Sequence, residues 1–178
     1  MQRHELKHLI RAAGRITNEY EFIIVGSQSI LGSMLQPPAE CVISVEADMY
    51  PMNAEDKADL IDGALGEGSP FHNTYGYYAQ GVDSTTAVLP AGWRDRLTRI
   101  QSDQTDRRVG LCLDVLDLFL SKCVANREKD HIFNKARLAH NIINVELALT
   151  RLPAMPLDAN QKTAIAALIH RLAKEARG

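Results

Sequence analysis

The fold of this chain is decided by two neighbouring stretches, FIIVGSQS at residues 22–29 and SVEADMY at residues 44–50. The first is a short apolar run that ends in a Gly-Ser turn, which predicts a buried strand followed by the start of a helix. The second predicts another strand, on which Glu46 and Asp48 project from the same face because successive side chains alternate. Two carboxylates side by side repel each other, so this face favours a bound cation. The turn offers free backbone N–H groups at a helix start, which suits a phosphate.

Apolar spacing predicts further elements on both sides of these stretches. An amphipathic first helix is expected to end at Gly14 or to have its last turn weakened there, and Asn53 is expected to cap a helix after the second strand. The other expected elements are a helix over residues 27–34, a strand over 41–49, one or two antiparallel strands within 75–89 and a strand over 109–113. The sequence therefore predicts an α/β (α+β) fold. A core of strands and helices is expected in residues 1–113, with a helical part in residues 114–178 packed on it.

Composition and charge are those of an ordinary globular protein, with 46% hydrophobic and 24% charged residues. The formal net charge of -2 excludes a global basic field, so any nucleic-acid contact would need a local patch. The three cysteines lack CxxC spacing, which argues against a disulfide framework and against a zinc site. No apolar run approaches the ~20 residues of a membrane span, and the first residues do not form a signal peptide. A cytoplasmic protein without membrane contact is expected.

Three stretches carry a family resemblance. The Gly26-Ser27 turn followed by the E-x-D pair of the second strand resembles the signature of the polymerase-beta-like nucleotidyltransferase superfamily. The run CLDVLDLFLSKCVANREKD at residues 112–130 resembles a segment of small bacterial nucleotidyltransferase-fold proteins that are related to AbiEii-type toxins. The run LPAGWRDRL at residues 89–97 resembles the same group.

This resemblance implies a nucleotidyltransferase-like mixed β-sheet flanked by helices, with a site that binds Mg²⁺ and a nucleoside triphosphate. Glu46 and Asp48 would be metal ligands with a catalytic role, and Asp83 is the candidate for a third metal acid. The Gly26-Ser27 turn would bind a phosphate of the nucleotide. The alternatives are a solvated strand face for the acid pair, a helix cap for Ser27 and a turn position for Asp83. Many superfamily members carry Asp where this chain carries Glu46.

The resemblance also assigns a cationic part of the site. It implies that Lys122 reaches the triphosphate and that Arg127 contributes to nucleotide binding. Lys122 and Asp130 are the implied catalytic residues of this part, and Asp130 would hold Lys122 or Arg127 in place. The alternatives are a lysine that extends from a packed helix into solvent and an acid favoured by a helix start. Asp114 and Asp117 are expected to cap their helix and to face solvent.

The implied activity is Mg²⁺-dependent transfer of a nucleoside monophosphate from a nucleoside triphosphate to a hydroxyl of RNA or protein. By analogy, such a protein could be the toxin of a toxin–antitoxin pair, with an antitoxin protein as its partner. The alternative is a catalytically inactive relative that binds a nucleotide or a partner protein. Hydrolase classes receive little support, because the histidines lack HxH or HExxH spacing and no GxSxG motif occurs.

Overall fold

The computed structural model describes residues 1–177, and the chain divides into two compact units. The first unit comprises Met1–Thr86 and Leu97–Leu113, and the second comprises Ala87–Arg96 and Asp114–Gly178. Each unit buries its own set of apolar side chains. The chain therefore passes from the first unit to the second after residue 86 and returns to the first unit at residue 97. It enters the second unit again at residue 114, after the last strand.

A five-stranded mixed sheet forms the centre of the first unit, in the order β3-β2-β1-β5-β4. The strands are β1 (Glu21–Val25), β2 (Glu46–Pro51), β3 (Tyr78–Gly81), β4 (Thr98–Ile100) and β5 (Val109–Cys112). β1 lies in the middle, antiparallel to β2 and parallel to β5. β3 runs parallel to β2, and β4 runs antiparallel to β5. The predicted mixed sheet is confirmed, and so is the buried central strand, because all four side chains from Phe22 to Val25 are buried.

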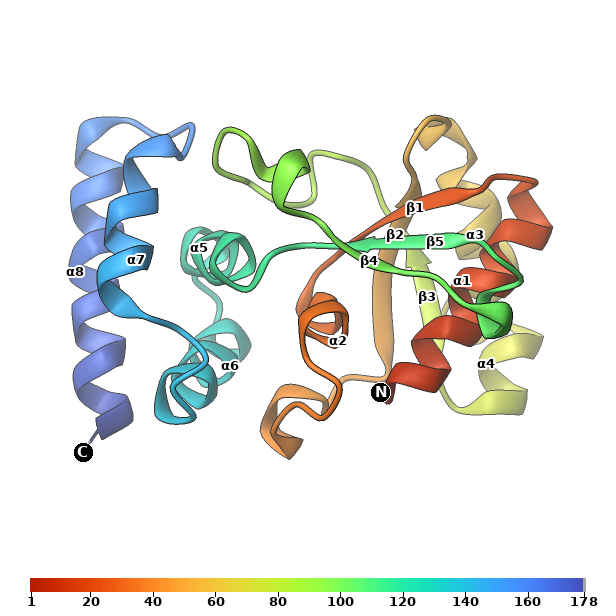
Figure 1. Ribbon diagram of the computed structural model, residues 1–178, viewed down its shortest axis with the longest axis horizontal. Coiled ribbons are helices and arrows are strands. Elements are labelled where there is room, and N and C mark those ends of the chain that lie inside the picture. Colours follow the sequence, from red (N-terminus) through yellow and green to blue (C-terminus); the bar gives the residue numbers. More distant parts are fainter. Residues whose placement is uncertain (178) are drawn as a thin grey trace. The chain divides into compact units, whose positions relative to one another are not determined.

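Helices cover one face of this sheet at close range. The helices of the first unit are α1 (Arg3–Thr17), α2 (Ile30–Ser33), α3 (Ala58–Leu65) and α4 (Pro70–Tyr75), and Figure 1 shows α1, α3 and α4 beside one another. A Cβ at Gly110 of β5 would lie 2.5 Å from Ile10 Cδ1 of α1, and a Cβ at Gly32 of α2 would lie 2.4 Å from the Cys112 Cβ. Residues two apart on a strand share a face, so α1 and α2 pack on the same face. The acids of β2 lie on the opposite face, because Asp48 pairs with Val25, whose neighbour Ile24 pairs with Cys112.

The second unit is helical, as predicted for the chain from Asp114 onward. Its helices, coloured blue-green to blue in Figure 1, are α5 (Val115–Ala125), α6 (Glu128–Ala139), α7 (Val145–Arg151) and α8 (Ala159–Arg177). A core of Phe119, Leu120, Ile169 and Leu172 joins α5 to α8. Within residues 1–177, no helix is both long enough and apolar enough to cross a membrane.

Several predicted boundaries are wrong, and local backbone geometry explains each one. The strand expected over residues 41–49 begins only at Glu46, because Ala39–Cys41 forms a 3₁₀ turn. Gly14 does not end α1, which continues to Thr17 and stops where Asn18 adopts the left-handed conformation (φ 58°).

Two further expectations also fail between the second strand and the middle of the chain. Asn53 does not cap a helix, because a 3₁₀ turn at Glu55–Lys57 precedes α3. Residues 75–89 contain one strand, β3, and it pairs with β2 in parallel instead of antiparallel orientation. The intervening α3 and α4 form a crossover connection, which a parallel pair requires.

The contact between β3 and α3 predicts a selective loss of stability. A Cβ at Gly81 would lie 1.9 Å from the Ala58 carbonyl oxygen, and backbone cannot rotate away as a side chain can. Gly81→Ala should therefore lower the free energy of unfolding by about 2 kcal/mol or more in urea denaturation. Gly63→Ala is the matched control on α3, where nothing lies within 4 Å. That control should raise stability by about 1 kcal/mol or less, and equal effects of the two substitutions would contradict the packing.

Candidate functional site

The two acids of β2 lie on one face of the strand, next to the Gly-Ser turn. Glu46 and Asp48 are half-buried, whereas Ala47 between them is fully buried on the opposite face. Asp48 is the register partner of Val25, the last residue of β1. A Cβ at Gly26 would lie only 2.1 Å from Asp48 Oδ2. The strand register therefore places the second carboxylate directly against the turn.

The turn requires glycine for two separate reasons. Gly26 has a φ of 69°, a conformation that side chains bearing a Cβ rarely adopt, and its missing Cβ leaves the room that Asp48 occupies. Ser27 opens the 3₁₀ turn Ser27–Ser29, whose N-cap position is Gly26. The Ser29 hydroxyl donates to the Ile24 carbonyl and so fastens the turn to β1. The Gly26-Ser27 backbone is thus held rigidly beside a carboxylate.

Gln28 connects this turn to the segment that leads into β2. Its side chain is buried, and its Nε2 donates to the Ser44 carbonyl oxygen at 3.1 Å. Because Ser44 lies two residues before Glu46, the bond fixes the entry of β2 relative to the turn. The sequence did not indicate this role, since a single Gln in a short helix has no distinctive spacing.

Tyr78 of β3 supports the first acid. Tyr78 is the register partner of Glu46, and its hydroxyl donates to Glu46 Oε2 at 3.4 Å. Burial raises the pKa of Tyr78 to about 12, together with the negative charges of Glu46, Glu67 and Asp48. The phenol therefore remains a neutral donor to a carboxylate near neutral pH. No local pattern could have predicted this contact, because the pairing joins residues 32 positions apart.

Asp83 occupies a turn away from the acid pair. Its side chain is exposed, and Oδ1 accepts hydrogen bonds from the Thr85 backbone N–H at 2.8 Å and the Thr85 hydroxyl at 2.5 Å. These hydrogen bonds lower the pKa of Asp83. Among residues 1–177, no group of three His, Cys, Asp or Glu side chains is placed to hold a metal ion. The structure thus does not bring Asp83 together with Glu46 and Asp48.

Lys122, Arg127 and Asp130 meet in the second unit. Lys122 Nζ lies 2.9 Å from Asp130 Oδ1, and Arg127 Nε lies 2.6 Å from Asp130 Oδ2. Burial raises the pKa of Asp130, but the hydrogen bonds from Arg127 and Lys122 outweigh it and lower the pKa overall. The Lys122 side chain is only 9% exposed and so does not extend into solvent. Asp130 sits in the first turn of α6 and binds both cations.

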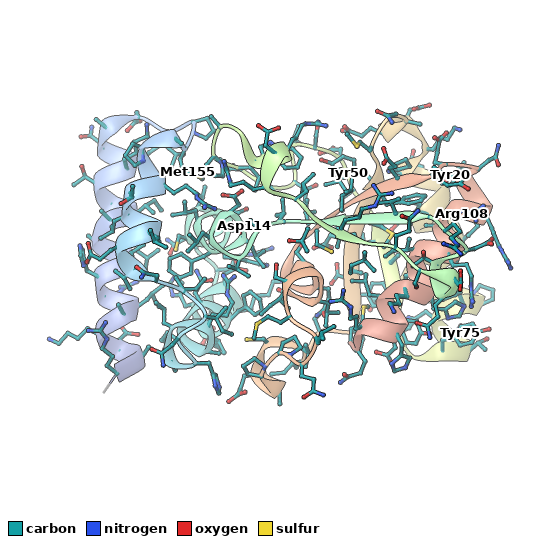
Figure 2. All side chains as sticks on the ribbon, viewed as in Figure 1. Tyr20, Tyr50, Tyr75, Arg108, Asp114 and Met155 are labelled. Carbon is teal, nitrogen blue, oxygen red and sulfur yellow. The ribbon has the colours of Figure 1, made fainter. Side chains whose placement is uncertain are left out.

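Asp117 is the centre of a second charged cluster that the sequence did not reveal. Asp114 caps α5 as predicted, accepting from the Leu116 N–H at 3.0 Å, and it lies at the start of that helix in Figure 2. The prediction that Asp117 faces solvent is wrong, because its side chain is fully buried. Arg96 Nε and Nη2 donate to its two oxygens at 2.9 and 3.2 Å, and Arg151 Nη1 donates at 2.8 Å. A carboxylate is buried only when it is paired, and the two arginines supply that pairing.

A comparison with known families assigns most of this chain to one family. Residues 4–167 match the family model described as "Nucleotidyltransferase of unknown function (DUF6036)". The chain therefore belongs to this nucleotidyltransferase family, which implies a nucleoside triphosphate as substrate. No curated protein and no solved structure matches the chain.

The pairing of Tyr78 with Glu46 predicts a shifted titration. Glu46→Gln removes a carboxylate charge and a charge-assisted hydrogen bond, both of which favour the protonated phenol, so the pKa of Tyr78 should fall from about 12. Carbon NMR of ring-labelled tyrosine would measure the change. Tyr77 is the internal control, because burial and Glu5 raise its pKa and Glu46 is not among the causes. An unchanged Tyr78 titration would show that Glu46 does not act on the phenol.

The buried Asp130 cluster predicts a pH-dependent loss of stability. Asp130→Asn leaves Lys122 buried without its carboxylate and should lower the free energy of unfolding by about 3 kcal/mol at pH 7. Because the pKa of Asp130 is depressed in the folded state, its contribution is present above the unfolded pKa and is lost as pH falls through the folded value. The difference between variant and wild type should therefore shrink in acid. Glu175→Gln, which breaks exposed ion pairs on α8, should cost under about 1 kcal/mol.

Proposed function

We propose that this protein is a Mg²⁺-dependent nucleotidyltransferase that moves a nucleoside monophosphate from a nucleoside triphosphate to a hydroxyl group of RNA or protein. The observation that supports the proposal is the close approach of Asp48 to Gly26, where an added Cβ would lie 2.1 Å from Asp48 Oδ2, so that the acid pair lies beside the turn that we propose binds a phosphate. Membership of a nucleotidyltransferase family supports the reaction class.

The acid pair fits the metal that this reaction uses. Glu46 and Asp48 offer hard carboxylate oxygens on one half-buried face, and Mg²⁺ usually takes one or two carboxylates and completes its shell with water and phosphate oxygens. A bound Mg²⁺ would neutralise charge on the phosphates and act as a Lewis acid. A third acid such as Asp83 is therefore not required for binding. We retain Asp83 only as the residue to test for that role.

The neighbouring residues would position the acids and the nucleotide. The Gly26-Ser27 backbone would donate N–H groups to a phosphate, with the Ser27 hydroxyl as a further donor. Tyr78 would hold one oxygen of Glu46, and so leave the other directed toward the metal. Gln28 would keep the turn in register with the acids through its bond to Ser44.

The basic cluster of the second unit is proposed to act on the same reaction. Lys122 would supply positive charge to the triphosphate, Arg127 would assist nucleotide binding, and Asp130 would orient both side chains. This assignment rests on the resemblance of residues 112–130 to the AbiEii-related group and on the ion pairs that fix the three groups. A role as toxin, with an antitoxin partner in a bacterial cell, rests on the same resemblance alone.

Loss of the second acid should abolish transfer. Asp48→Ala removes a metal ligand, and transfer of label from a labelled nucleoside triphosphate to RNA or protein should slow by ~10²-fold or more in the presence of Mg²⁺. Asp59→Ala removes an exposed acid of α3 and should leave the rate unchanged. Transfer that survives Asp48→Ala would exclude the metal assignment.

A second readout separates the active enzyme from an inactive relative that still binds ligands. Mg²⁺ at the acid pair should shift the NMR signal of the Tyr78 ring, which touches Glu46, and leave that of Tyr20 in place. The shift should disappear in Glu46→Gln. A shift without label transfer on any acceptor would favour the inactive relative.

A further inference from the structure

The segment Trp93–Arg96 of the second unit presents a stacked aromatic and guanidinium pair. It forms a single 3₁₀ turn, and the Arg94 guanidinium carbon lies 4.8 Å from the centre of the Trp93 ring. Trp93 is half-buried, whereas Arg94 is exposed. The pair therefore offers a planar, cationic surface to solvent. The proposed reaction makes no use of this segment, although LPAGWRDRL is one of the stretches that carry the family resemblance.

Polar contacts hold this exposed turn firmly to the helical unit. The Ala91 N–H donates to the Ala154 carbonyl oxygen at 2.9 Å, and Arg96 Nη2 donates to the Ala91 carbonyl oxygen at 3.2 Å. Two nitrogens of the same Arg96 side chain, Nε and Nη2, donate hydrogen bonds to the carboxylate of the buried Asp117. An ion pair with a buried acid thus anchors this surface turn, and preorganised binding groups need such support. The anchoring gives Trp93 and Arg94 a defined position.

Charge decides which ligand suits this surface. Arg96 and Arg151 are neutralised by Asp117 and Asp114 within one network. Arg94 has no carboxylate partner among the ion pairs of residues 1–177, and the neighbouring Asp95 is exposed. One available cation suits the single charge of a phosphodiester better than the several charges of a triphosphate. An unstacked base, in turn, binds well to aromatic rings and to guanidinium planes.

We propose that Trp93 and Arg94 bind single-stranded RNA. One base would stack on the pair formed by the Trp93 ring and the Arg94 guanidinium, and the adjoining phosphate would bind to Arg94. The assignment rests on the proposed function and deepens it, because it selects RNA and not protein as the acceptor. The net charge of -2 had required that any RNA contact use a local patch, and this pair is such a patch. Binding governed by stacking and one phosphate should depend weakly on salt, with a slope of about -0.7 in a plot of log K against log [salt].

The chain is suited to a direct test, because Trp93 is its only tryptophan. Titration of the full-length protein with an unlabelled single-stranded oligoribonucleotide, on the order of ten nucleotides long, should quench its fluorescence without Mg²⁺ or nucleotide. Fluorescence anisotropy of the labelled oligonucleotide should show affinity reduced on the order of tenfold or more in Trp93→Ala and in Arg94→Ala. Arg94→Lys keeps the charge but not the plane, and should fall between wild type and Arg94→Ala.

Controls keep the two proposals distinguishable. Arg171→Ala, at an exposed arginine of α8 in the same unit, should bind RNA as wild type does. Three outcomes would each overturn the RNA assignment. They are an equal loss of RNA affinity in Arg171→Ala and Arg94→Ala, fluorescence quenching by nucleoside triphosphates alone, and wild-type RNA affinity in Trp93→Ala. RNA binding is measured without turnover, so a protein that binds RNA through Arg94 but transfers no label would refute the proposed reaction and leave this inference standing.

Discussion

The register of β1 between β2 and β5 is the constraint on which the candidate site depends. β1 is buried on both faces and pairs with a strand on each side. A shift of this pairing by one residue would move every side chain of β1 to the other face of the sheet. That register sets Asp48 opposite Val25, and hence beside Gly26. Tyr78 reaches Glu46 because β3 extends the same sheet in parallel. A hydrophobic interaction in the core thereby fixes the spacing of groups on the polar face.

Charge in the second unit follows a common rule, in which each buried acid binds two cations. Asp130 binds Lys122 and Arg127, and Asp117 binds Arg96 and Arg151. Burying one carboxylate costs several kcal/mol, and ideal pairing offsets much of that cost without adding net stability. Such clusters are thus better explained by the orientation they impose than by the energy they supply. In both cases, the oriented groups are long basic side chains that would otherwise move freely.

Local chemistry made part of this structure predictable from sequence. The apolar run of β1 and the E-x-D alternation of β2 depend only on neighbouring residues, and both are confirmed. The direction of β3, the support from Tyr78 and the burial of Asp117 depend on partners far along the chain, which periodicity does not encode. Asp117 in particular has the sequence pattern of a solvated helix acid, but it pairs with Arg96, 21 residues earlier in the chain. The boundary errors at Gly14 and Asn53 arose where a left-handed residue ends α1 and where a 3₁₀ turn precedes α3.

The chain crosses between the two units three times. Residues 87–96 leave the sheet unit between β3 and β4, bond to α5 and to Ala154 in the helical unit, and return. Neither unit is therefore one continuous piece of sequence. A fragment of residues 114–178 would contain Asp117 without Arg96, and a fragment ending at residue 113 would contain Arg96 without its acid. The helical part of residues 114–178 is thus not a detachable module, because its buried Asp117 needs an arginine from a segment that lies between two strands in the sequence.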